Sequence, residues 1–323
     1  MNVKIGKISR RVAILTGAAS LCILGIVGNI ANASDKIVIG HSQPNLGWAY
    51  IAAFTNALEA AAAKLPNVEV ITLSADGDIA KQSSDIDSLI ARKVDVLLVT
   101  SLDGNAVVPS LMAASEAGIP ILAVSNEPAK AGQAIIKGFS GPDDYVQGVI
   151  AAELLHEALG SKGKIALIEG SPGQSTTLLR TQGLKDGLKK LGSGLEIIAA
   201  QTADWNPIKA KTVAENYLTA YGNDLNGIFG HDDNTAAAAA EVFHEKGRTD
   251  IISVGTGGTI NGLKAIRDGL MYGTMDQSPT TDAHQALEFA LMLAKGKELP
   301  KRRNIIPMPK ITIGNVADFK GEW

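Results

Sequence analysis

Polar and aromatic side chains follow short apolar runs at several places in this sequence, where they could contact a small molecule. Trp48 and Tyr50 lie beyond the loop that ends the first apolar run, in a chain that is only 4% aromatic. Ser125, Asn126 and Glu127 come directly after another such run. Aromatic faces can contact apolar parts of a ligand, and hydroxyl, amide and carboxylate groups can form hydrogen bonds with its polar groups. The alternatives are core packing of the aromatics and loop capping by the polar residues.

The tripeptide His231-Asp232-Asp233 follows a further apolar run and allows two interpretations. It could be a metal cluster, but adjacent residues at the end of a strand seldom converge on one ion. Hydrogen bonding of Asp232 to a ligand is the favoured interpretation. Asp233 is expected to cap a helix that starts at Asn234.

Sequence motifs for catalysis or nucleotide binding are lacking. The glycine-rich turns at 170–173 and 255–258 fit neither a dinucleotide fingerprint nor a P-loop. No Gly-x-Ser-x-Gly elbow occurs, and the five histidines are scattered without the context of a catalytic triad. The two turns instead indicate a close approach of the backbone to a ligand or a hinge.

These residues must be positioned by an alternation of strands and helices that runs through the chain. The apolar run Lys36–His41 predicts a buried strand, and a helix follows from Trp48 through Leu58. Strict alternation predicts parallel sheets with right-handed crossovers, in which ligands bind beyond the carboxyl ends of the strands. Further strands are predicted at 68–73, 95–100, 119–124, 134–139, 164–168, 195–199, 227–230, 251–254 and 272–275, with an extended piece at 305–313. Further helices are predicted at 79–93, 106–117, 145–159, 175–191, 207–221, 234–246, 260–268 and 281–295.

The alternation restarts after residues 140–142, which predicts two α/β lobes joined by a hinge. The chain is expected to cross between the lobes near Ser140, near 277–279 and near 307–309. The predicted N-terminal lobe is 34–139 plus 278–307. The predicted C-terminal lobe is 140–277 plus 308–323.

Residues 1–33 have the pattern of an export signal. Four basic residues precede an uncharged stretch from Val12 to Ile30, and Ala31-Asn32-Ala33 fits a small-x-small cleavage site. An uncleaved membrane anchor is the alternative, and a twin-arginine route is left open. Cleavage would change the net charge from −3 to −7 and remove the single cysteine, Cys22. Such an acidic chain without basic clusters is not expected to bind nucleic acid.

Over essentially all of the predicted mature chain, the sequence resembles the type I periplasmic sugar-binding proteins of ABC importers, the ribose and galactofuranose group. The order and spacing of several short motifs carry the resemblance. They are Ser42-Gln43, Gly47-Trp48, 95–100, 117–121, Asp144 with Gly148, 170–183 with Arg180, 203–205, 231–233, 254–255 and 276–279. The resemblance implies that two lobes close over one small ligand, held by stacking aromatics and a ring of polar side chains.

Departures from the family pattern concern the ligand. Where the family usually has an Asp-Arg pair, this chain has Ser125-Asn126, and Leu178 aligns with a ligand-binding arginine. Gly257 stands in place of an aspartate. With both arginines missing and the carboxylates of Glu127 and Asp232 available, the site should accept hydroxyl or ammonium donors. This favours a neutral sugar or polyol, or an amino sugar, over an acidic sugar.

Gln277 matches the family pattern, and Trp205 falls where an aromatic commonly stacks on the ligand. The predicted ligand-binding residues are Gln43, Trp48, Tyr50, Ser125, Asn126, Glu127, Trp205, Asp232 and Gln277.

The resulting hypothesis is an exported, non-enzymatic solute-binding protein of the periplasm. It binds a monosaccharide, sugar alcohol or amino sugar by hinge closure and delivers it to the permease and ATPase of an ABC importer. It is expected to be a monomer without cofactor or metal, and a membrane chemoreceptor is left open as a further partner. The rivals are an exported α/β enzyme that acts on a sugar and a repressor-type regulator. The regulator would need a DNA-binding helix pair at the N-terminus, where this chain has the export signal.

Overall fold

The computed structural model describes residues 36–323, so the predicted export signal lies outside the described residues. The described chain forms two α/β lobes, each built on a six-stranded sheet with the order expected of a doubly wound fold. We call the lobe that contains β1 the N-lobe and the lobe that contains β6 the C-lobe. The fold class therefore agrees with the prediction.

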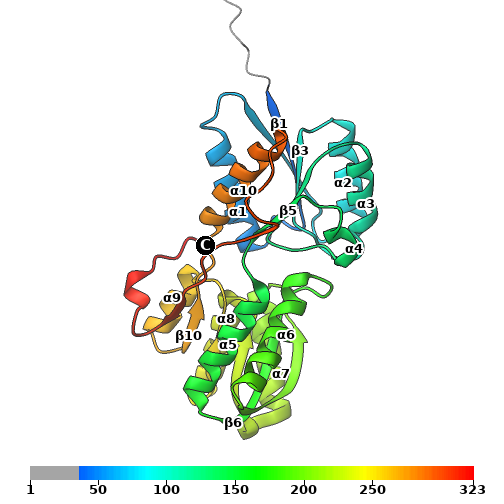
Figure 1. Cartoon of the computed structure of the whole chain (residues 1–323). Coiled ribbons are helices and arrows are strands. Elements are labelled where there is room, and N and C mark those ends of the chain that lie inside the picture. Colours follow the sequence, from blue (N-terminus) through cyan, green and yellow to red (C-terminus); the bar gives the residue numbers. More distant parts are fainter. Residues whose placement is uncertain (1–35) are drawn as a thin grey trace, which may run out of the picture. The chain divides into compact units, whose positions relative to one another are not determined.

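All strand pairs of the N-lobe sheet are parallel, in the order β11-β5-β4-β3-β1-β2. Figure 1 shows α1 and α10 on one side of β1 and β3, and α2 and α3 on the other. The strands are β1 (Ile37–Gln43), β2 (Val68–Ser74), β3 (Val96–Val99), β4 (Ile121–Val124), β5 (Gly138–Gly141) and β11 (Arg303–Ile305). The helices are α1 (Ala49–Ala62), α2 (Ile79–Ala91), α3 (Val108–Glu116), α4 (Lys130–Gln133) and α10 (Pro279–Ala294).

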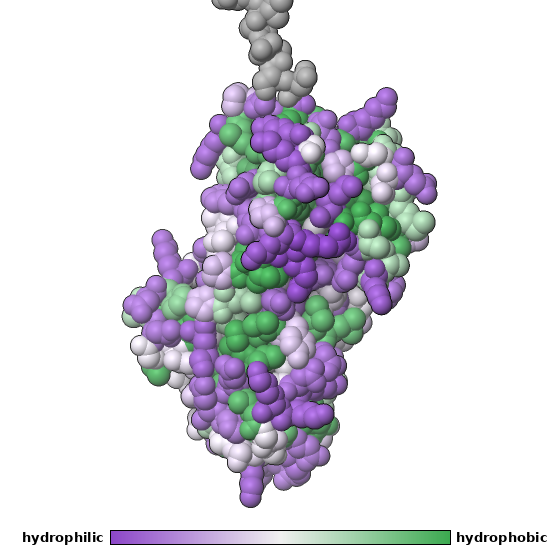
Figure 2. Space-filling model, in the orientation of Figure 1, coloured by the Kyte–Doolittle hydropathy of each residue, from purple (hydrophilic) through white to green (hydrophobic). Residues whose placement is uncertain are grey.

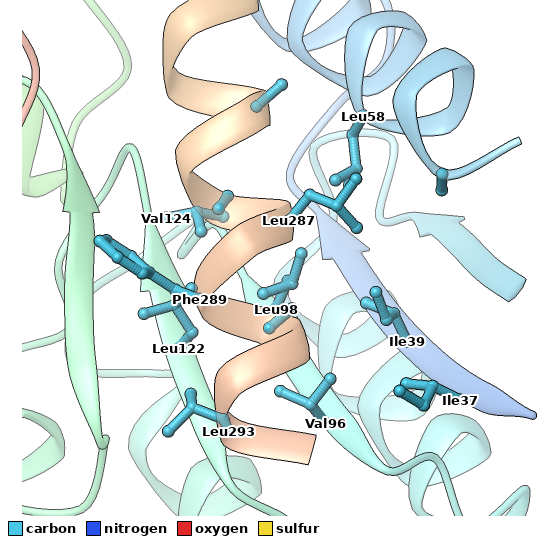
Figure 3. Close-up of a cluster of buried hydrophobic side chains, with 14 of the residues drawn as sticks. Ile37, Ile39, Leu58, Val96, Leu98, Leu122, Val124, Leu287, Phe289 and Leu293 are labelled. Atoms are coloured by element: carbon cyan, nitrogen blue, oxygen red, sulfur yellow. The ribbon is translucent and has the colours of Figure 1, made fainter. Parts of the chain in front are cut away.

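The central strands of the N-lobe read as continuous apolar runs because helices cover both of their faces. Ile39 and Leu98 point toward α1 and α10, where Leu58 and Leu287 complete one cluster (Figure 3). A second cluster lies on the opposite face, under α2 and α3. Although α10 comes late in the sequence, it is thereby a core element of the N-lobe.

The C-lobe sheet has the order β12-β10-β9-β8-β6-β7, and only the pairing of β10 with β12 is antiparallel. Its strands are β6 (Lys162–Glu169), β7 (Gly194–Thr202), β8 (Leu225–Gly230), β9 (Ile252–Val254), β10 (Gly273–Met275) and β12 (Lys310–Thr312). Its helices are α5 (Asp144–Leu159), α6 (Ser175–Lys190), α7 (Pro207–Tyr221), α8 (Asp233–Glu245) and α9 (Ile260–Arg267), with short 3-10 helices η1 (Gly222–Asp224) and η2 (Val316–Asp318).

The chain passes between the two sheets three times: from β5 to α5, from β10 to α10, and from β11 to β12. The predicted extended piece 305–313 is therefore two short strands in different sheets, separated by Pro307 and Pro309. A proline lacks the N–H that a sheet ladder needs, so neither strand can continue through this stretch.

The fifth strand lies later than predicted. The apolar residues Ile135 and Ile136 are not in the sheet but in a turn after α4, where both of their N–H groups bond to the carbonyl of Gly132. They are apolar because they pack into the cluster under α3. A short apolar run does not by itself distinguish a strand from a packed turn.

The cap of α8 also differs from the prediction. Asp232, not Asp233, is the N-cap residue, and its side chain accepts a hydrogen bond from the N–H of Thr235. Asp233 is fully buried and accepts hydrogen bonds from Thr259 N and from the hydroxyl of Thr274. It thereby ties α8 to its neighbours in the C-lobe.

Hydrophilic and hydrophobic residues are interspersed over the face of the molecule shown in Figure 2. Among the helices of residues 36–323, none is both long and apolar enough to cross a membrane.

Candidate ligand-binding site

One pocket is lined by residues of both lobes, and most of them follow the carboxyl ends of strands. Its empty space, open solvent at the mouth included, is about 500 Å³. The parallel strands aim their carboxyl ends at this pocket, as expected for doubly wound sheets. The lining residues are Trp48, Ala49, Tyr50, Ile51, Ser125, Asn126, Gln174, Thr176, Arg180, Trp205, Asp232, Gln277 and Trp323.

Aromatic rings form the walls, and all three tryptophans of the sequence take part. Trp48, at the start of α1, meets Trp205 edge-on with ring centroids 6.5 Å apart. Tyr50 meets Trp323 in the same manner, at 5.3 Å. Edge-to-face contacts of this kind are a favoured geometry of aromatic pairs and hold the rings in place.

The turn that carries Trp205 has an unusual backbone. Asp204 and Trp205 have φ values of 55° and 58°, a left-handed region that costs most residues about 1–2 kcal/mol each. The indole N–H donates to Gln174 Oε1 at 2.8 Å. Gly170 lies under the ring, where a Cβ would overlap it. Strain that is held by surrounding contacts is typical of functional sites.

The C-lobe floor of the pocket centres on Arg180, which is only 3% exposed. Its guanidinium is 3.1 Å from Asp144 Oδ1 and donates to Gln147 Oε1 at 3.0 Å and to Gln277 Oε1 at 2.8 Å. It also donates to the carbonyl of His231. Most of its donors are therefore used inside the protein rather than left for a ligand.

Burial shifts the pKa values of the carboxyl groups at this floor. It raises the pKa of Asp144 to about 6, against the opposing effect of Arg180. It also raises the pKa of Asp232, against the hydrogen bonds from Thr235. Arg180 stays charged because a guanidinium is effectively always protonated in proteins. With both carboxylates ionised, the Arg180 site carries one more negative than positive charge.

The N-lobe wall is held by Asp282, a fully buried residue of α10. Its Oδ2 accepts hydrogen bonds from the hydroxyls of Tyr50 at 2.8 Å and Ser125 at 2.9 Å, and its Oδ1 accepts one from Ser140 at 3.2 Å. Burial raises the pKa of Asp282 to about 7, while these three donors act in the opposite direction. Asp282 thus positions two pocket residues without lining the pocket itself.

The lobes also bond to each other beside the pocket. The hydroxyl of Thr176 donates to Asn126 Oδ1, and the N–H of Glu127 donates to Ser175 Oγ at 2.7 Å. The N–H of Gly104 donates to the carbonyl of Gly173 at 3.2 Å. These three bonds join the loops of the N-lobe to the start of α6 in the C-lobe.

Seven of the nine residues predicted from the sequence line this pocket together, and Gln43 and Glu127 do not. The carboxylate of Glu127 is 2.7 Å from a guanidinium nitrogen of Arg303 and accepts from Gln133 at 3.2 Å. Gln43 is buried at the end of β1 and bonds to the ring of His41. A ligand-binding role stays a prediction for all nine, and the positions of these two do not favour it.

The expectation of a pocket without arginine was wrong, because Arg180 takes part in the lining. Leu178 is 60% exposed, whereas Arg180 is buried and lines the pocket. Two positions along a helix are about 200° apart around its axis, so the two side chains point in opposite directions. Arg180 had already been identified within the 170–183 motif.

Gln174, Thr176 and Trp323 line the pocket as well and were not predicted. Gln174 is 1% exposed, and its Nε2 has no hydrogen-bond partner. A buried donor without a partner is costly, which suits a group that bonds to a ligand. Tryptophan is rare in this chain, and that rarity is the feature of the sequence that could have identified Trp323 as a candidate.

The metal interpretation of residues 231–233 gains no support from the geometry. Within residues 36–323 no group of three or more His, Cys, Asp or Glu side chains could hold a metal ion. Asp232 and Asp233 lie in separate hydrogen-bond networks, one at the pocket and one against Thr274.

Comparisons with known proteins agree with this architecture. Residues 39–298 match the family described as "Periplasmic binding protein domain". The xylitol-binding protein of Mycolicibacterium smegmatis is 31% identical over 254 residues, 79% of this chain and 71% of that protein. The ribose import binding protein of Bacillus subtilis is 29% identical over 273 residues, 84% of this chain and 87% of that protein.

A solved structure shows the same fold. The ABC transporter solute-binding protein of Bacillus halodurans, determined with bound myo-inositol, superposes with a TM-score of 0.83 at 24% identity, over 90% of this chain and 100% of that one. The match to the family covers residues 39–298, most of the sequence. The chain therefore belongs to the periplasmic binding protein family.

Proposed function

We propose that this protein is the solute receptor of an ABC importer and binds a neutral sugar or sugar alcohol in the pocket between its lobes. The observation that carries the proposal is the composition of that pocket. Three tryptophans and a tyrosine surround a floor of amide, hydroxyl and carboxylate groups. A polyhydroxylated molecule has apolar C–H faces and many hydrogen-bonding groups. The aromatic walls match the first feature and the polar floor matches the second.

The charges of the floor favour a ligand without negative charge. Arg180 is paired with Asp144, and Asp232 adds a second carboxylate nearby. An acidic sugar would bring its carboxylate toward this excess of negative charge, which opposes binding. An amino sugar is the second candidate, with Asp232 as the partner of its ammonium group. Glu127 is not available for that role because it is paired with Arg303.

The names of relatives support the same ligand class. One relative is named for xylitol and another for ribose, and the solved structure of similar fold holds myo-inositol. These are neutral molecules rich in hydroxyl groups. The pocket residues of this chain have the chemistry to bind such a molecule.

Membership of this family supports the remaining features of the proposal. The chain acts in the periplasm, and its predicted export signal agrees with that location. Its lobes, with the predicted boundaries, close on the ligand by a hinge motion, and the loaded form is the one that the permease and its ATPase accept. We expect a monomer without catalytic turnover. A chemoreceptor partner stays a prediction.

A thermal-shift screen of the purified protein against sugars, polyols, amino sugars and sugar acids tests the proposal. A ligand that binds only the folded state raises the melting temperature by mass action. We expect neutral polyols or sugars to raise it and sugar acids to leave it unchanged. A response to sugar acids alone would contradict the proposed ligand class, and a flat screen would contradict the sugar-receptor function.

Calorimetry on two variants then tests the pocket. Trp205→Ala and Asp232→Ala should each weaken binding at least about tenfold, because a stacking or buried polar contact contributes on the order of 1–3 kcal/mol. Asp232→Asn is the matched control, since asparagine is an equally good helix cap and removes only the charge. Unchanged affinity in both alanine variants would mean that the ligand binds elsewhere.

A further inference from the structure

The segment Phe319–Trp323 follows η2 and reaches the pocket along the start of α9. The carbonyl of Trp323 accepts a hydrogen bond of 2.9 Å from the N–H of Ile260, the first residue of α9. Gly321 lies so close to Ile260 that a Cβ would overlap its backbone. The segment therefore rests directly on the C-lobe.

The same segment also bonds to the crossing that leads into the N-lobe. Glu322 accepts a hydrogen bond from the hydroxyl of Ser278 at 2.9 Å and another from the N–H of Thr280 at 3.1 Å. Both partners lie at the start of α10. Trp323 is thus fixed at two points. Its own carbonyl bonds to α9 of the C-lobe, and the neighbouring Glu322 bonds to the start of α10.

The indole ring of Trp323 has a defined position in the wall. Its N–H donates to the carbonyl of Gln277 at 3.3 Å, and its edge meets the ring of Tyr50 at 75°. Gly257, with φ of 135°, lies on the C-lobe side, where a Cβ would be 2.6 Å from Trp323 Cζ2. The half-buried ring lines the pocket between these neighbours.

Gly257 and Trp323 together explain a departure seen in the sequence. The family pattern has an aspartate at position 257, and here any side chain at that position would collide with the indole ring. This chain therefore has an aromatic surface where the pattern has a carboxylate. A carboxylate accepts hydrogen bonds from ligand hydroxyls, whereas an indole ring contacts C–H groups.

We propose that Trp323 is a ligand-contacting residue that determines specificity, because it replaces a polar contact by an apolar wall. The inference rests on the proposed function and narrows it. The preferred ligand presents C–H groups, not paired hydroxyls, toward the start of α9. A bulky substituent on that edge of the ligand would meet the ring and be rejected.

The test compares Trp323→Ala, Trp323→Phe and Lys320→Ala with the unaltered protein. Lys320 is an exposed residue of the same segment that does not line the pocket, so its variant controls for general effects on the segment. Calorimetry measures binding of xylitol, ribose, myo-inositol and their deoxy and O-methyl derivatives. Thermal melts without ligand show whether each variant is folded.

We expect Trp323→Ala to weaken binding of the preferred probe at least tenfold and to reduce discrimination against its O-methyl derivatives. Trp323→Phe should recover part of the affinity, and Lys320→Ala should bind like the unaltered protein. Unchanged binding by Trp323→Ala would overturn this inference alone. Tighter binding would also overturn it, because the ring would then occupy the ligand's place. If the unaltered protein bound no probe, both the proposed function and this inference would fail.

Discussion

The two lobes each bury a carboxylate behind the pocket, but they stabilise it in different ways. In the N-lobe, Asp282 is surrounded by hydroxyl donors and has no cationic partner among the contacts of its side chain. In the C-lobe, Asp144 faces the guanidinium of Arg180. Hydroxyls can bond to either protonation state of a carboxyl group, whereas an ion pair requires the charged state.

This difference means that the two walls should respond to different perturbations. The C-lobe floor depends on keeping both charges, so removal of one partner leaves the other buried and uncompensated. The N-lobe wall has no ion pair to break, but the pKa of Asp282 is raised to about 7, so the stabilisation from this carboxyl group should change with pH. The largest effect is expected in the C-lobe.

Arg180→Met should lower the free energy of unfolding by about 3–5 kcal/mol, because Asp144 is then left buried without its partner. Ligand binding should be lost, since Gln277 also loses a donor that orients it. Urea unfolding and calorimetry measure the two effects. The double variant Arg180→Met/Asp144→Asn should regain much of the stability but not the binding. Full stability in the single variant would show that the pair is not coupled as described.

Asp282→Asn should flatten the dependence of stability on pH. An unfolded aspartate ionises near pH 4, whereas the pKa of Asp282 in the folded protein is about 7. The folded state therefore holds the proton more tightly. The stabilisation from this carboxyl is full below about pH 4 and is lost as the pH rises through about 7, an effect on the order of a few kcal/mol.

Urea unfolding between pH 4 and 8 measures this effect. Burial also raises the pKa of Asp233 to about 7 and that of Asp144 to about 6, and both shift the curve in the same direction. Only the difference between the variant and the unaltered protein is therefore informative. Asp87→Asn, which makes the same substitution at an exposed aspartate of α2, is the control. An equal slope in Asp282→Asn would indicate that Asp282 stays charged.

Gly173→Ala should weaken ligand binding several-fold without altering a pocket residue. Gly173 has φ of 84° and meets the N-lobe at Asp103, whose carboxylate an added methyl group would overlap. The methyl group should therefore oppose the approach of the lobes. Calorimetry gives the affinity, and small-angle scattering with saturating ligand shows whether the lobes still close.

Gly247→Ala is the matched control for this substitution. Gly247 lies in the same lobe with φ of 77°, but a Cβ there would have no atom within 4 Å. Both variants carry the same backbone strain, so their difference isolates the contact with the opposite lobe. Equal affinities would show that this contact has no part in binding.

The fold and the location of the pocket could be predicted from local patterns. Buried parallel strands such as β3 are continuous apolar runs, and polar residues such as Ser125 and Asp232 follow directly where strands end. Because parallel strands bring their carboxyl ends together, this pattern already predicts a shared site. The short turn before β5 was predicted as part of a strand, because its residues Ile135 and Ile136 are apolar. They pack into the core but do not pair with a neighbouring strand.

Strand and helix periods are local properties, so the sequence alone determined the two-lobed α/β fold. Together with the family resemblance, it also located seven of the nine predicted pocket positions. Tertiary structure decided which side chains face the pocket. It paired Glu127 with Arg303, turned Arg180 inward and Leu178 outward, and brought Trp323 beside Tyr50. These outcomes depend on segments far apart in the chain, or on which face of a helix is buried. The pattern of residue types along one segment does not contain that information.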